Sequence, residues 1–271
     1  MVELFEQDIR KNDRQSSKGN QLKWENNNIW YKADYTGYEG LTEYVISELL
    51  KKSTLNNNEF VLYKLVEIKY MKNKYNGVSS VNFLKDDWQV ITLERLFKNY
   101  DGEGLNKHIW LIHDADERLK FIVSNIEKIT GLKDFGIYMN KLLTIDCMFL
   151  NEDRHTHNIA VLMNSEGKYA LCPIFDNGAG LLSDTLMDYP LGEDVYKLID
   201  GVKSKTISLN FEEQMDSSER LYGMNIKFKF TKKDLENILD SEEASIYPIE
   251  VRERVKTILY EQMRRYPYLF E

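Results

Sequence analysis

Residues 150–162, LNEDRHTHNIAVL, decide how the rest of this chain is interpreted. They follow an apolar segment, residues 138–150, whose composition predicts a buried helix. Residues 159–163 and 169–175 are predicted to form two strands joined by a turn at 164–167, and the polar turn FDNG, residues 175–178, follows them. The order is therefore a buried helix, a polar loop, a β-hairpin and a second polar turn.

The polar side chains of these two turns suit phosphoryl transfer from ATP. Asp153 would orient an acceptor hydroxyl and take its proton, while the amide oxygen of Asn158 and the carboxylate of Asp176 would hold Mg²⁺ against the phosphates. The predicted hairpin would place Asn158 and Asp176 at neighbouring strand ends, within reach of one metal ion. Hard oxygen ligands of this kind favour Mg²⁺ over zinc.

The D-R-H-x-x-N pattern after an apolar helix, with F-D-N-G downstream, resembles the HipA-like serine/threonine kinases and, more remotely, the lipid kinases. The resemblance assigns Asp153 as the catalytic carboxylate and Asn158 and Asp176 as metal ligands. His155 is expected to support the catalytic loop by hydrogen bonding, because its spacing from His157 without a third ligand is a poor zinc pattern. Arg154 is interpreted as a structural ion-pair residue, and Asp146 as an ion-pair or internal capping residue.

The N-terminal third carries the remaining parts that a kinase needs. Lys32 lies in a predicted strand, residues 29–33, and Glu43 in a predicted helix, residues 42–52, with Thr42 as its N-cap. The W-x-K and G-L-x-E patterns resemble the ATP-binding lysine and its glutamate partner in HipA-like kinases. The alternative for Lys32 is a solvated lysine on the strand surface. The alternative partners of the ATP-binding lysine are Glu39 and Glu48.

Residues 16–23, SSKGNQLK, resemble the phosphate loop of the same family. Backbone N–H groups at Gly19, Asn20 and Gln21 would then hold phosphate oxygens. The resemblance makes Ser16 and Ser17, at the start of this stretch, candidates for autophosphorylation. A phosphoserine adds about −1.5 to −2 charges and would weaken ATP binding. The alternative is an ordinary polar N-terminal segment.

The resemblance covers roughly residues 15–265, including residues 204–214, SKTISLNFEEQ. It implies an α+β, bilobal, protein-kinase-like fold with ATP between the lobes. The predicted N-lobe, residues 1–95, is small and sheet-rich, with further strands at 60–70 and 78–84 and a turn at 74–77. The predicted C-lobe, residues 96–271, is larger and helical. Its predicted helices include 116–130, stopped by Gly131, then 231–239, capped by Thr231, and 248–265.

Composition narrows the candidate partners. The chain has 271 residues, with 36 Lys and Arg against 44 Asp and Glu, a formal net charge of −8 that disfavours direct nucleic-acid binding. No apolar run is long enough for a membrane span, and the N-terminal residues lack the apolar core of a secretory signal. Cys147 and Cys172 are isolated, as is typical of cytoplasmic proteins.

These observations favour a cytoplasmic ATP- and Mg²⁺-dependent protein serine/threonine kinase. The family resemblance implies a toxin-like or regulatory role, with a protein substrate and a helix-turn-helix antitoxin as a candidate partner. Two alternatives stay open. The same motif would serve a small-molecule or lipid phosphotransferase, although the acidic balance counts against a lipid surface. A catalytically weak pseudokinase that binds a regulatory partner is the other alternative.

Overall fold

The computed structural model describes residues 1–9 and 21–271. It divides the chain into two compact units, each assembled from segments that are distant in sequence. The first unit comprises Met1–Phe83, Phe175–Val202 and Lys227–Glu271, and the second comprises Leu84–Ile174 and Lys203–Ile226. The boundary between an N-lobe and a C-lobe at residue 95 stays a prediction.

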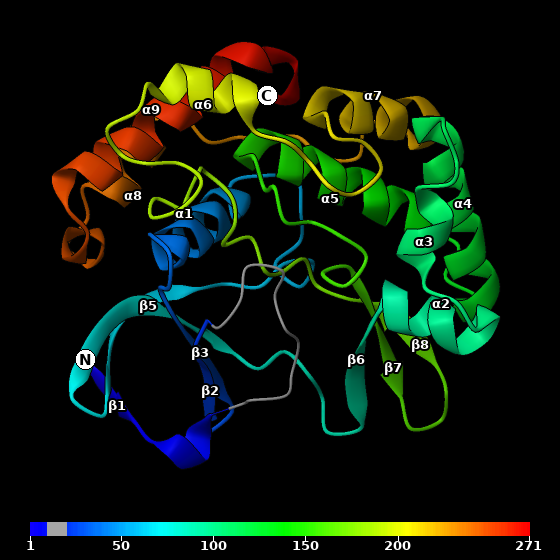
Figure 1. The fold of residues 1–271 in the computed structure, drawn as a ribbon, viewed down its shortest axis with the longest axis horizontal. Helices are drawn as coiled ribbons and strands as arrows, with labels where there is room; N and C mark the ends of the chain where they lie inside the picture. Colours follow the sequence, from blue (N-terminus) through cyan, green and yellow to red (C-terminus); the bar gives the residue numbers. More distant parts are fainter. Residues whose placement is uncertain (10–20) are drawn as a thin grey trace. The chain divides into compact units, whose positions relative to one another are not determined.

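A curled five-stranded sheet forms the N-terminal part of the first unit (Figure 1). Its strands, in spatial order, are β1 (Val2–Leu4), β4 (Lys64–Tyr70), β5 (Asn73–Val81), β3 (Ile29–Ala33) and β2 (Lys23–Asn26). β1 pairs with β4 in parallel, and the other neighbours are antiparallel. The predicted strand at 29–33 is confirmed, whereas β2 was not predicted because its alternation is short and polar.

The hairpin between β4 and β5 corrects two predictions. The strand predicted at 60–70 begins only at Lys64, and the turn predicted at 74–77 is wrong because those residues belong to β5. The chain instead reverses just after β4, where Met71 has a positive φ of 55°. Gly77 lies inside the strand, where an added Cβ would meet the Lys32 carbonyl oxygen at 2.1 Å. Glycine here permits a close strand approach rather than a turn.

The helices of the first unit are α1 (Glu39–Leu50), α6 (Val195–Gly201), α8 (Lys232–Leu239) and α9 (Ile249–Arg265). α1 packs on β4, β5 and α8, and α9 packs on α6 and α8. The prediction that Thr42 caps α1 is wrong, because the helix begins at Glu39 and Thr42 is buried in its second turn. Thr231 caps α8 as predicted, in a reciprocal pair of hydrogen bonds with Asp234.

The second unit contains a small antiparallel sheet and a group of helices. The sheet has the order β6 (Trp88–Thr92), β7 (Ala160–Asn164) and β8 (Tyr169–Leu171). The helices are α2 (Leu93–Asp101), α3 (Leu105–Ile109), α4 (Ala115–Thr130), α5 (Phe135–Phe149) and α7 (Phe211–Tyr222). The predicted hairpin at 159–175 is therefore present, with a shorter second strand, and the unpredicted β6 extends it to three strands.

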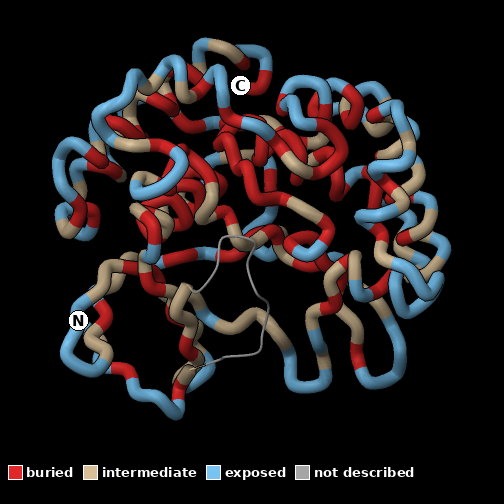
Figure 2. The backbone as a smooth tube through the Cα atoms, in the orientation of Figure 1, coloured by how far each residue is buried: buried red, intermediate tan, exposed pale blue. Residues whose placement is uncertain are grey.

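Helix α5 is the core of the second unit, and nearly all of its residues are buried (Figure 2). It packs against α4 and α7. α4 ends at Gly131, which has the left-handed conformation predicted for a stop signal. α5 ends at Leu150, also left-handed with φ 54°, and this directs the chain into the polar loop that precedes β7.

Short 3-10 helices complete the chain at Glu6–Asp8, Glu243–Ile246 and Pro267–Leu269. None of the helices formed by the described residues is long and apolar enough to cross a membrane.

Candidate active site

Two carboxylates of the first unit meet at Lys32. Its Nζ atom lies 2.8 Å from Oε1 of Glu43 and 2.7 Å from Oδ1 of Asp176. Lys32 is in β3, Glu43 is in α1, and Asp176 is in the turn that follows residue 174. One strand, one helix and one distant turn thus contribute a single side chain each to a charged triad, Lys32–Glu43–Asp176.

Glu43 binds Lys32 of the triad and the backbone of Asn177, the residue that follows Asp176. One carboxylate oxygen accepts from Lys32, and the other accepts the backbone N–H of Asn177 at 3.0 Å. The Glu43 side chain is only 2% exposed, so these contacts are shielded from water. Asp176 has a positive φ of 62°, a conformation that Asp tolerates better than most residues. Glu43 therefore fixes the turn that presents the Asp176 carboxylate.

The neighbours of Lys32 keep it charged. Burial alone would lower the pKa of the ammonium group, but the carboxylates of Asp176 and Glu43 raise it well above its ordinary value. Nζ also lies 5.3 Å from the centre of the Tyr63 ring, and the Tyr63 hydroxyl accepts the N–H of Asp176 at 3.4 Å. Lys32 is thus a fixed cation and not a solvated strand lysine.

The two competing glutamates have other contacts. Glu39 accepts backbone N–H groups of the loop before α1, including those of Thr36 and Gly37. Glu48 pairs with Lys51 at the end of the same helix. Among these three glutamates, the structure brings Glu43 to Lys32.

The catalytic-loop candidates lie together in the second unit. Asn158 donates from Nδ2 to the backbone carbonyl of Asp153 at 2.9 Å and, more weakly, to its carboxylate at 3.4 Å. The N–H of Asn158 donates to the carbonyl of His155 at 2.7 Å. Nε2 of His155 is 3.8 Å from Oδ1 of Asp153. The loop therefore folds back on itself and directs Asp153 and Asn158 to one side.

A buried ion pair anchors this loop to α5. Nε of Arg154 lies 3.0 Å from Oδ2 of Asp146, and both side chains are almost completely buried. Arg154 also donates to the carbonyl of Asn158, and its own carbonyl accepts the hydroxyl of Thr206. The interpretation of Arg154 and Asp146 as ion-pair residues is confirmed.

Lys205 and His155 are basic side chains near the Asp153 carboxylate. Nζ of Lys205 is 3.6 Å from Oδ1 of Asp153. Burial lowers the pKa of His155, while the Asp153 carboxylate partly opposes that shift. Lys205 was not among the predicted site residues. The available signal was its position in residues 204–214, a stretch already similar to the kinase family.

The oxygen ligands predicted for Mg²⁺ suit that ion. The amide Oδ1 of Asn158 accepts no hydrogen bond from the described residues, because Nδ2 makes the contacts to Asp153. Asp176 supplies a carboxylate. The described residues contain no group of three or more His, Cys, Asp or Glu placed to hold a metal, so phosphate and water oxygens would complete the coordination. A metal shared by Asn158 and Asp176 stays a prediction.

The predicted phosphate loop falls largely outside the described residues. Ser16, Ser17, Gly19 and Asn20 are not described, so their roles as phosphate-binding and autophosphorylation residues stay predictions. Gln21 is described and immediately precedes the segment leading into β2.

Comparison with solved structures identifies the fold class. No protein-family profile and no curated protein sequence matches this chain. The crystal structure of the proinflammatory kinase CtkA of Helicobacter pylori matches with a TM-score of 0.59 at 17% identity, over 97% of this chain and 94% of that chain. The predicted α+β kinase-like fold is thereby confirmed.

A second solved structure is HipA from the Shewanella oneidensis MR-1 toxin–antitoxin system, determined with HipB and operator DNA. It matches with a TM-score of 0.46 at 13% identity, over 94% of this chain and 66% of that chain. The kinase-like fold that the sequence resemblance implies is thus shared with one solved kinase structure, that of CtkA.

Proposed function

We propose that this chain is an ATP- and Mg²⁺-dependent protein serine/threonine kinase. The observation that carries the proposal is the charged triad, in which a buried glutamate holds Lys32 beside the carboxylate of Asp176. Kinases use such a strand lysine and helix glutamate to bind nucleotide phosphates. The catalytic-loop geometry around Asp153 supports the same reaction.

The first-unit residues would bind and orient the nucleotide. Lys32 would donate to oxygens of the α- and β-phosphates, and Glu43 would keep its ammonium group in place. Asp176, together with Asn158 of the second unit, would hold Mg²⁺, which supplies charge neutralisation at the phosphates when bound. Backbone N–H groups of residues 19–21 would hold further phosphate oxygens.

The second-unit residues would act on the acceptor. Asp153 would accept the proton of a serine or threonine hydroxyl as its oxygen bonds to the γ-phosphorus. The bond from that phosphorus to the bridging oxygen breaks, and ADP leaves with the electron pair. Lys205 would stabilise the negative charge on the transferred group, and His155 would support the loop beside Asp153.

The biological setting is proposed from the sequence resemblance. We propose a toxin-like or regulatory kinase of the cytoplasm, with a protein substrate and a helix-turn-helix antitoxin as its partner. Phosphorylation of Ser16 or Ser17 would add negative charge next to the phosphate-binding residues and reduce ATP affinity. Phosphate mapping on protein from cells, beside the Asp153→Ala variant, tests this regulation.

The transfer of labelled γ-phosphate from ATP to proteins of a cell extract tests the proposed activity. Asp153→Ala and Asp176→Asn are each expected to lose activity on the order of 10²–10³-fold. Asp86→Asn changes the charge at an exposed position and should leave the activity unchanged. Undiminished transfer by both site variants would overturn the proposal. Label in lipid vesicles alone would favour a lipid kinase, and Mg²⁺-independent ATP binding without turnover a pseudokinase.

A further inference from the structure

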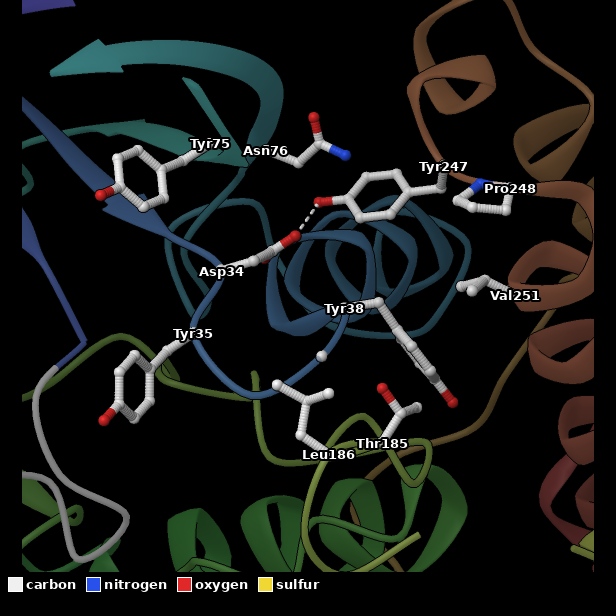
Figure 3. Close-up of a pocket in the computed structure, with 11 residues that line it drawn as sticks. Asp34, Tyr35, Tyr38, Tyr75, Asn76, Thr185, Leu186, Tyr247, Pro248 and Val251 are labelled. Carbon is white, nitrogen blue, oxygen red and sulfur yellow. Dashed lines mark hydrogen bonds between the residues drawn. The ribbon is translucent and has the colours of Figure 1, made fainter. Parts of the chain in front are cut away.

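The first unit contains a pocket outside the charged triad, with a volume of about 370 Å³ (Figure 3). The walls come from the loop between β3 and α1, from β5, from residues 185–186 and from the start of α9. Four tyrosines contribute to the lining: Tyr35, Tyr38, Tyr75 and Tyr247. The proposed kinase reaction uses none of these residues.

Asp34 is the charged residue of this pocket. Its Oδ1 accepts the N–H of Gly40 at 2.6 Å. Its Oδ2 accepts the hydroxyl of Tyr247 at 2.7 Å, the hydrogen bond drawn in Figure 3. Both donors are neutral, and no lysine, arginine or histidine among the described residues pairs with this carboxylate. Burial, with a smaller contribution from nearby Glu39, raises the pKa of Asp34 to about 7.

A carboxylate held by neutral donors retains lone pairs for a cationic partner. A buried carboxylate gains most from a partner that carries both a charge and N–H donors, because both offset its desolvation. The tyrosines that line the pocket offer ring faces that can add favourable contacts to the same kind of group. The volume of about 370 Å³ is large enough for a small ligand or a side chain.

We propose that this pocket binds a positively charged amine or guanidinium group, with Asp34 as its anionic partner and the surrounding tyrosines as its aromatic walls. The group would come either from a free small molecule or from a lysine or arginine side chain of a peptide.

The pocket borders the segments that carry the charged triad. Asp34 lies two residues after Lys32 and binds the first turn of α1, the helix that carries Glu43. The N–H of Leu186 donates to the carbonyl of Thr36 at 2.9 Å.

The two loops that border the pocket are also in direct contact. The N–H of Tyr38 donates to the carbonyl of Ser183, and the Tyr38 hydroxyl donates to the carbonyl of Leu181. A bound ligand thus contacts both the loop entering α1 and the segment that follows Asp176. A resulting change in nucleotide affinity rests on the proposed kinase function, whereas cation binding does not.

Ethylguanidinium and its neutral analogue ethylurea are the probes that test charge recognition. Titration followed by NMR or calorimetry on the full chain should show binding of the cation and at least tenfold weaker binding of the urea. Asp34→Asn keeps the side-chain shape, with Oδ1 able to accept from Gly40 and Nδ2 able to donate to the Tyr247 hydroxyl, and should weaken ethylguanidinium binding by at least tenfold. Asp86→Asn, which removes an exposed charge, should bind it as the unchanged chain does.

A second variant keeps the proposal testable should Asp34→Asn fold poorly. Thr185→Arg introduces a guanidinium group at the pocket wall and should block the probe. A short acetylated peptide with one arginine separates the two sources of the cation: tighter binding than ethylguanidinium points to a peptide, and weaker binding to a free small molecule.

Equal binding of ethylguanidinium and ethylurea, or full cation binding by Thr185→Arg, would overturn the proposed site. Nucleotide affinity is measured in the same samples. Cation binding that leaves nucleotide affinity unchanged would overturn only the coupling to the triad, and loss of nucleotide binding with cation binding intact would count against the kinase proposal alone.

Discussion

Lys32 Nζ and Glu43 Oε1 lie 2.8 Å apart, and the Glu43 side chain is only 2% exposed. The lysine therefore compensates a carboxylate that water barely reaches. Removing Lys32 leaves the buried Glu43 carboxylate without its counter-ion, which costs more than the pair itself contributes, whereas removing Glu43 leaves Lys32 paired with Asp176. The Lys32–Glu43 pair thus affects folding stability as well as the proposed phosphate binding.

A double-mutant cycle separates these contributions. Lys32→Met and Glu43→Gln should each destabilise the chain, and the double variant should be more stable than the sum predicts, with a coupling energy of about 1–3 kcal/mol. Urea unfolding measures it. The Glu48–Lys51 pair on the same helix is more exposed and should give a coupling below about 0.5 kcal/mol. Equal couplings for the two pairs would contradict this prediction. Lys32→Met should also reduce phosphotransfer on the order of 10²–10³-fold.

Breaking the buried Arg154–Asp146 pair should destabilise the second unit more than breaking an exposed ion pair of the same unit. Arg154→Met removes the cation from a fully buried carboxylate and should lower the free energy of unfolding by about 3–5 kcal/mol. Lys120→Met breaks a geometrically similar pair with Glu117 on the surface and should barely shift the urea midpoint. A small effect of Arg154→Met would show that the loop is held by its other hydrogen bonds.

Asp34 should make stability depend on pH. Its pKa in the folded chain is about 7, above the unfolded value of 3.8, so the folded state binds the proton more tightly. The contribution of the protonated Asp34 carboxyl to the free energy of unfolding is fully present below about pH 4, and it is lost as the pH rises to about 7.

The measurement compares Asp34 with its neutral isostere. Relative to Asp34→Asn, the unchanged chain should lose roughly 1–3 kcal/mol between pH 4 and 7 and nothing more above pH 8. The titratable groups that act on this carboxyl are Glu39 and Tyr247, and Tyr35, Tyr38 and Tyr75 line the same pocket. Chemical denaturation at several pH values measures the difference. A constant difference across this range would contradict the raised pKa.

Lys205 is expected to assist the transfer step. Its ammonium group lies 3.6 Å from the Asp153 carboxylate, so Lys205→Gln should lower kcat by about tenfold or more with little change in stability. Lys203→Gln, at an exposed position two residues earlier, is the matched control. Equal kcat values for the two variants would remove Lys205 from the proposed site.

Helix ends were predicted best where a single residue type, such as a capping threonine or a stop glycine, meets a local backbone requirement. Thr231 caps α8 and Gly131 ends α4, as predicted, because each residue satisfies its structural requirement locally. Thr42 carried the same signal and was wrong, since Glu39 binds the N–H groups of the preceding loop and allows α1 to begin earlier. Gly77 resembled a turn residue, although its role is to let β3 approach β5.

The sequence indicated which residues belong to the candidate site, but it did not indicate all of the contacts between them. The spacing of Asp153 and Asn158 within one loop gave their proximity directly. The choice of Glu43 over Glu39 and Glu48 required knowing where α1 begins, which no local signal fixed. Lys205 lies far from Asp153 in sequence, and only the folded chain brings its ammonium group to that carboxylate.

The discontinuous make-up of the first unit has a consequence during protein synthesis. Its sheet is encoded by the first 83 residues, but the segments that complete the unit include residues 227–271. At ~5–20 residues per second, the ribosome needs roughly 10–40 s to extend the chain from residue 83 to residue 271. During that interval the nascent sheet lacks α8 and α9, and apolar α1 residues such as Leu49 and Leu50 lack part of their packing. We therefore expect a nascent-chain chaperone to bind at the apolar residues of α1.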